Sequence, residues 1–203
     1  KRKKYLDEMK RLIANKLLSI DSLKNMAKKI EEDMARLNQS KQILIIGEVN
    51  ILFNDFLNNY TFKTMEEKGI HLLYQPLSEY MWFLWMDYLK QKKNKEEKTA
   101  HTLMDKFKSY IKIISSIFGE SSFEENLDEL EPRANKDMGL YSGANGRYRY
   151  SKLTGNINDI NGIINISSMY ENTNTIINIL HQDTDNDNQI PILNMTFDGN
   201  ENE

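Results

Sequence analysis

The chain alternates short, predominantly apolar runs with longer segments in which apolar residues recur every three or four positions. The short runs are residues 43–47 (ILIIG), 70–74 (IHLLY), 162–166 (GIINI) and 190–195 (IPILNM). Continuous apolar runs of this length are typical of strands that are buried on both faces of a parallel sheet. We therefore predict four strands that are separated by helices.

The segments between these runs have helical spacing. We expect helices over residues 55–68, 98–118 and 172–180, a helix within residues 76–90 that Ser78 is placed to cap, and a short helix in the acidic segment before Pro132. Strands that alternate with helices pair in parallel through crossover connections. The predicted fold class is therefore α/β, with a four-stranded, parallel, doubly wound sheet of the flavodoxin/Rossmann type and an N-terminal helical hairpin.

Residues 5–38 carry apolar positions at alternating intervals of three and four, which is a strong helical pattern. Ser19 and Asp21 lie at a plausible break and are suited to cap a second helix that begins near Ser22. We expect residues 1–40 to form a hairpin packed on an α/β three-layer domain of residues 41–203. The alternative is a coiled-coil surface for a partner. The basic start and acidic end of the chain indicate a piece of a longer protein.

Composition narrows the function classes. The net charge of −3 over 203 residues gives no reason to expect a nucleic-acid partner. No apolar run approaches the roughly 18–20 residues that a membrane helix needs, so we expect a cytoplasmic protein without a membrane partner. The chain has no cysteine, so it cannot supply a cysteine nucleophile or a thiolate ligand. Its three histidines are far apart and share no ligand spacing, so we expect no metal site.

Polar side chains follow each predicted strand at its carboxyl end. In a parallel sheet these ends share one edge, where ligands of open α/β sheets bind. The candidates for this ligand edge are Glu48, Asn50, Asn54, Gln75, Ser78, Glu79, Ser167, Ser168, Tyr170, Glu171, Asp198 and Asn200. Glu48 and Glu171 can do acid–base work if the fold holds them close together, although carboxylates and amides at strand ends also cap helices.

Other motifs each allow two interpretations. The aromatic stripe of Tyr80, Trp82, Phe83 and Trp85 is either a stacking platform or, as we favour, core. The chain contains no GxGxxG, P-loop or GxSxG pattern. Residues 183–188 (DTDNDN) lack the glycine and distal glutamate of an EF-hand loop, so we favour a solvated turn.

The basic residues Arg147, Arg149 and Lys152 also allow two interpretations. Guanidinium groups suit bidentate anions, so these side chains can hold a phosphate or a carboxylate. We favour exposed charges on a short helix.

Several segments together resemble a known family. They are Gly47-Glu48, residues 54–58 (NDFLN), Leu73 with residues 76–80 (PLSEY), residues 159–180 and residues 190–200 (IPILNMTFDGN). In order and spacing this pattern is similar to the 2-hydroxyacyl-CoA dehydratase/benzoyl-CoA reductase family, in particular its activase-associated members. The likeness covers most of residues 10–200.

The resemblance implies a doubly wound domain beside an iron–sulfur cluster, an acyl-CoA-type ligand and an ATP-dependent activase partner. In the family, the loop that matches the segment after residue 166 carries a cluster-ligating cysteine followed by Pro-Gly. Here Glu171, Thr173 and Asn174 occupy the corresponding positions. We therefore expect a dehydratase- or activase-type domain without its own cluster. The alternatives are a degenerate, non-catalytic domain that binds a ligand or partner, and a bare scaffold that assembles through its N-terminal helices.

Overall fold

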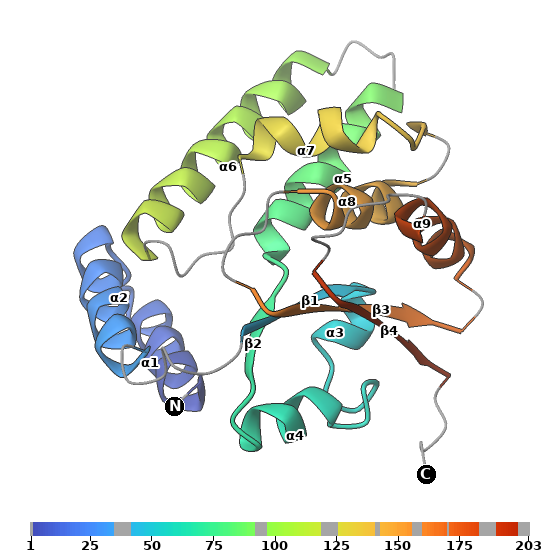
Figure 1. The fold of residues 1–203 in the computed structure, drawn as a ribbon. Helices are drawn as coiled ribbons and strands as arrows, with labels where there is room; N and C mark the ends of the chain where they lie inside the picture. Colours follow the sequence, from blue (N-terminus) through green and yellow to red (C-terminus); the bar gives the residue numbers. More distant parts are fainter. Residues whose placement is uncertain are drawn as a thin grey trace.

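The computed structural model describes residues 2–34, 42–91, 97–118, 126–140, 143–155, 160–169, 171–182 and 190–198. Within these residues the chain forms one parallel sheet with the strand order β2-β1-β3-β4 (Figure 1). The strands are β1 (Gln42–Gly47), β2 (His71–Tyr74), β3 (Gly162–Ser168) and β4 (Ile192–Phe197). The predicted α/β fold class with a parallel, doubly wound sheet is confirmed.

Helices cover both faces of the sheet. Ile45, Ile164 and Ile166 pack with residues of α3 (Val49–Leu52) and α4 (Thr61–Glu67) on one face. Leu44, Ile46 and Ile163 pack on the other face with residues of α8 (Ala144–Leu153) and α9 (Asn172–Gln182). Alternate strand residues thus enter two separate cores, which is why the strand sequences are apolar at almost every position.

The connections give the sheet a topological switch point. The β1–β2 connection runs through α3 and α4 on one face, whereas the β3–β4 connection runs through α9 on the other face. Because β1 and β3 are neighbours, their carboxyl ends lead into loops that leave in opposite directions (Figure 1). This is the position at which open α/β sheets bind ligands.

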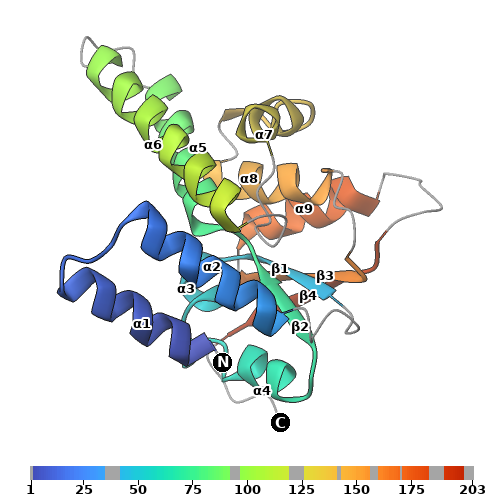
Figure 2. The ribbon, with the colours of Figure 1, turned by 90° about the vertical axis from the view of Figure 1, so that its left-hand side faces the viewer.

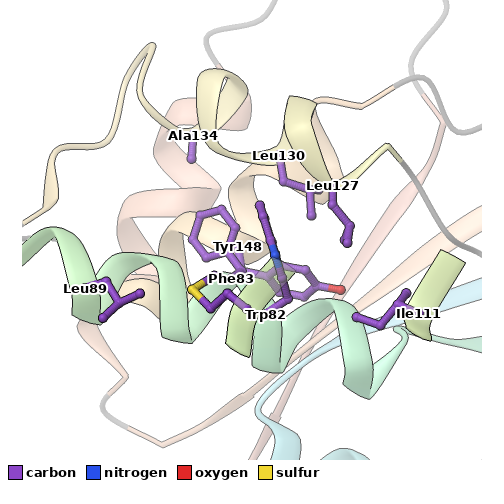
Figure 3. Close-up of a cluster of buried hydrophobic side chains, with 9 residues drawn as sticks. Trp82, Phe83, Leu89, Ile111, Leu127, Leu130, Ala134 and Tyr148 are labelled. Carbon is purple, nitrogen blue, oxygen red and sulfur yellow. The ribbon is translucent and has the colours of Figure 1, made fainter. Parts of the chain in front are cut away.

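A second helical cluster lies beyond α8, on the side away from the sheet. It is formed by α5 (Leu77–Gln91), α6 (Glu97–Phe118) and α7 (Leu127–Ala134), which pack around Tyr148 of α8 (Figure 3). Trp82 and Phe83 are buried in this cluster, and Tyr80 and Trp85 pack against it. The core interpretation of the aromatic stripe is therefore confirmed. The helix before Pro132 differs from expectation, since Pro132 lies inside α7.

The N-terminal segment forms a helical hairpin of α1 (Arg2–Ala14) and α2 (Ile20–Met34) (Figure 2). The Ser19 and Ser22 side chains each accept a hydrogen bond from the other's backbone N–H, at 3.1 and 2.8 Å. Ser19 thus caps a helix that begins two residues earlier than predicted. α2 lies against α6, with Met26 and Ala27 buried. The division into two domains stays a prediction.

The segment after β1 departs from the predicted helix 55–68. Residues 55–60 form turns, and the helix α4 begins only at Thr61. Asn59 and Tyr60 have positive φ values of 50° and 54°, which a continuous helix does not allow. Asn54 stabilises the turn instead, because its Oδ1 accepts the N–H groups of Phe56 and Leu57 at 3.1 and 3.4 Å.

Among the helices of the described residues, none is long and apolar enough to cross a membrane. The DTDNDN segment, Tyr170 and Asn200 lie outside the described residues.

Candidate functional site

The carboxyl end of β1 is joined closely to its two neighbouring strands. Gly47 has φ = +142°, and a Cβ there would lie 2.1 Å from the Ile166 carbonyl oxygen of β3. The buried Gln75, which follows β2, accepts from the Gly47 N–H at 3.0 Å and donates to its carbonyl at 3.3 Å. These contacts fix the direction in which the next residue, Glu48, leaves the sheet.

Asn145 connects the two sides of the switch point. Its Nδ2, in the first turn of α8, donates to Glu48 Oε2 at 3.5 Å and to Glu171 Oε1 at 3.3 Å. Glu48 directly follows β1, and Glu171 directly precedes α9. The fold therefore brings together the two carboxylates whose separation the sequence left open. We call Glu48, Asn145, Arg149 and Glu171 the switch-point site.

Arg149 holds the Glu171 carboxylate in place. Its Nη1 donates to Glu171 Oε1 at 2.5 Å, and the Arg149 side chain has no solvent exposure. Its Nη2 donates to Asn165 Oδ1, the Ile166 carbonyl and Asn174 Oδ1 at 2.8 to 3.1 Å. One guanidinium group thus ties α8 to β3 and α9. A charge-assisted pair of this kind keeps Glu171 oriented toward the site.

Polar side chains line the sheet beneath this pair. The Asn165 Nδ2 donates to Asn174 Oδ1 at 2.7 Å and to Asn194 Oδ1 at 2.9 Å. Asn174 Nδ2 donates to Ser167 Oγ at 3.1 Å, and Ser167 is bonded to Thr196 at 3.1 Å. The candidate Ser167 is therefore part of a buried network that supports the site. A network whose members are satisfied in this way favours one arrangement of its side chains.

Tyr80 of α5 supplies a phenol near the site. Burial raises the pKa of Tyr80, and the Glu48 and Glu171 carboxylates raise it further, against an opposing effect of Arg149. The phenol therefore stays protonated at neutral pH and can donate a hydrogen bond.

Two oxygen atoms at the site are buried without a hydrogen-bond partner among the described residues. They are Glu171 Oε2 and Asn145 Oδ1. Buried acceptors without a donor are uncommon in folded proteins and call for an explanation. A ligand that donates hydrogen bonds would satisfy both.

The basic residues of α8 are buried, so their interpretation as exposed charges is wrong. Arg147 pairs with Asp87, and Lys152 pairs with Glu79 at 2.9 Å. The Tyr148 hydroxyl also donates to Glu79 at 2.8 Å. The candidate Glu79 is thus an internal partner with no exposure. These cations do hold carboxylates, as the alternative interpretation allowed, but the carboxylates belong to the protein itself.

The remaining sequence candidates lie further from this cluster or make weaker contacts with it. Asn50 is exposed and donates to Glu48 Oε1 at 3.5 Å. Ser168 and Ser78 are half-buried, the former at the end of β3 and the latter in the first turn of α5 rather than at its N-cap. Asp198 is exposed after β4.

An iron–sulfur cluster does not fit these residues. The chain has no cysteine, and the carboxylate at the position that corresponds to the family's cysteine is already paired with a guanidinium group. Nor do the described residues contain a group of three or more His, Cys, Asp or Glu side chains that could hold a metal ion. The side chains gathered at the site are the Glu48 and Glu171 carboxylates, the Asn145 amide, the Arg149 guanidinium group and the Tyr80 phenol.

Comparison with protein-family models, with curated proteins and with solved structures found no match for this chain.

Proposed function

We propose that this chain is a ligand-binding domain of a 2-hydroxyacyl-CoA dehydratase- or activase-type protein, and that it binds without a cluster of its own. The observation that carries the proposal is the Asn145 bridge between Glu48 and Glu171. It assembles polar groups from both sides of the switch point, where this fold class binds ligands.

The resemblance supports the same place in the sheet. The Gly47-Glu48 pair and the segment around Glu171 are both among the matching residues. At Glu171 a charged hydrogen-bonding group stands where the family has a metal ligand, and Arg149 balances its charge. We infer that the site retained binding and lost redox chemistry, and that the domain by itself is not catalytic.

The unpartnered acceptors indicate the kind of ligand. Glu171 Oε2 and Asn145 Oδ1 both require a donor, and the single O–H of a 2-hydroxyacyl group can donate to one of them. The Tyr80 phenol, kept protonated by its raised pKa, can donate to the carbonyl oxygen of the same ligand. An acyl-CoA with a 2-hydroxyl therefore matches the polarity of the site better than the same thioester without the hydroxyl.

A partner-binding role is the second candidate, and the turn after β1 favours it. Phe56 is 77% exposed, and the nearby Leu57 and Tyr60 are 42% and 50% exposed. Exposed aromatic side chains of this kind are enriched in protein interfaces. An ATP-dependent activase domain is the partner that the resemblance implies.

Calorimetric titration tests ligand binding. We expect a 2-hydroxyacyl-CoA to bind more tightly than the matching acyl-CoA, and Asn145→Ala to weaken its binding by up to about tenfold, the effect of one lost hydrogen bond. Glu67→Gln, which changes an exposed carboxylate of α4, serves as the control and should bind like the wild type. Absence of binding to any acyl-CoA would contradict the ligand proposal.

Two further measurements separate the alternatives. Iron and sulfide analysis of the anaerobically purified protein should find no stoichiometric cluster. If a candidate activase is retained by the wild-type protein in a pull-down but not by Phe56→Ser, the result would favour the partner-binding role over ligand binding.

A further inference from the structure

Some backbone donors and acceptors of β4 point away from the rest of the sheet. Pro191 and Phe197 accept hydrogen bonds from β3, at 2.9 Å from Ile163 N and 3.2 Å from Met169 N. Backbone groups alternate in direction along a strand, so the N–H and C=O groups of Ile192, Asn194 and Thr196 point away from β3. Among the described residues no strand pairs with that edge. Figure 1 shows β4 at the outer end of the sheet.

This edge lacks the features that usually protect one. The strand Ile192–Phe197 (ILNMTF) contains no charged residue and no proline, and Leu193 on its α3/α4 face is 55% exposed. Natural edge strands generally carry lysine, proline or a bulge that prevents pairing with another chain. An uncharged edge with outward-facing donors and acceptors is therefore suited to receive another strand.

We propose that this edge pairs with the β4 edge of a second copy of the chain, antiparallel about a twofold axis, so that one sheet runs through both subunits. A twofold interface needs a self-complementary surface, and an uncharged strand can lie against its own copy without placing like charges opposite each other.

The neighbouring helix extends the surface on one face of the sheet. α9 packs at this end through Ile177 and Leu180, in the same apolar cluster as Ile192. Two further apolar residues of α9, Ile176 and Ile179, are 45% and 56% exposed. Six paired residues bury little of the roughly 1,200–2,000 Å² that a stable interface requires. Contact between the two α9 helices supplies the additional apolar area.

Sedimentation over about 1 to 500 µM tests the proposal, because it covers the range in which interfaces of this size associate. We expect a dimer whose population rises with concentration. Asn194→Pro removes one outward N–H per subunit and leaves the backbone hydrogen bonds between β3 and β4 intact, so the dissociation constant should rise about tenfold or more. Asn194→Ala is the matched control. Both variants lose the side-chain bond to Asn165, but Asn194→Ala keeps the backbone donor and should dimerise like the wild type.

Leu193→Lys provides a second test in case Asn194→Pro does not fold. It places a charge on the exposed face of β4 and should also shift the protein toward monomer. A separate measurement uses the wild type: hydrogen exchange of the backbone amides of residues 192, 194 and 196 should slow as the protein concentration rises. A wild-type protein that stays monomeric at the highest concentration would overturn the proposal. This holds both if the outward amides exchange freely and if another part of the chain protects them. A dissociation constant in either folded edge variant that is unchanged from the wild type would overturn it as well.

Discussion

The buried pair of Arg149 and Glu171 gives the sharpest stability prediction. Replacing Arg149 with methionine keeps an unbranched side chain of moderate length but removes every hydrogen bond that the guanidinium donates. Glu171, whose side chain is only 13% exposed, then loses its cation, and the Ile166 carbonyl and Asn165 amide oxygen lose a donor. Removing one partner from a buried pair typically destabilises a protein by about 3–5 kcal/mol, and we expect a loss in that range.

Urea unfolding followed by circular dichroism measures the loss. Lys136→Met removes an exposed cation and should change the free energy of unfolding by less than about 0.5 kcal/mol. The double variant Arg149→Met/Glu171→Met should be less destabilised than the sum of the two single changes by at least about 1 kcal/mol, since the groups interact directly. A loss below about 1 kcal/mol for Arg149→Met would refute the described network.

Three further predictions concern the strand end, the tyrosines and the neighbouring pair of α8. Gly47→Ala should abolish folding or lower the free energy of unfolding by more than about 3 kcal/mol, because the added Cβ would collide with the Ile166 carbonyl. Gly69→Ala, which has open space around its Cβ, should lower the free energy of unfolding by only about 1 kcal/mol in the same denaturation assay. Burial raises the pKa of Tyr150, and the hydrogen bond to Asp137 raises it further. The stability that the protonated Tyr150 contributes is therefore complete below the tyrosine pKa of the unfolded chain, about 10, and is lost as the pH rises through the higher pKa of the folded state. Tyr150→Phe should therefore weaken the loss of stability that the wild type shows above about pH 10, and an unchanged slope would count against this assignment. Lys152→Met should cost about 3–5 kcal/mol by leaving the buried Glu79 without its cation, and a neutral effect on the midpoint of thermal unfolding would contradict that pairing.

The apolar runs were sufficient to predict the strands. All four begin and end within two residues of the observed bounds, and the run at 190–195 is shifted by two residues to Ile192–Phe197, beyond Pro191. Runs of this kind are informative because both faces of each strand are covered. The helix after β1 was predicted too early, since residues 54–60 form a turn held by the Asn54 side chain and by two positive φ values. Neither interaction is visible in the spacing of apolar residues.

The candidate site was predicted in part. Glu48 and Glu171 follow from the rule that strand ends carry function, and the fold places them together. The sequence did not identify Asn145, because its partner Glu48 lies 97 residues away in the chain. It placed Arg149 on the surface, because its partner Glu171 lies 22 residues away. One signal was available: residues 147–150 alternate arginine with tyrosine, and they lie within residues 146–153, all of which are buried. The acids that neutralise these cations are Asp87, Glu79 and Glu171, and only a tertiary structure pairs them.

The most direct test of the proposed function follows the side-chain amide of Asn145 by NMR while a 2-hydroxyacyl-CoA is added. Binding at the switch-point site should shift the Asn145 Nδ2 resonances in a saturable way, and more strongly than the matching acyl-CoA without the hydroxyl. The exposed side-chain amide of Asn25 in α2 serves as an internal reference and should remain unchanged. Saturable binding that leaves Asn145 unperturbed, or shifts that do not depend on the hydroxyl, would contradict the assignment of this site.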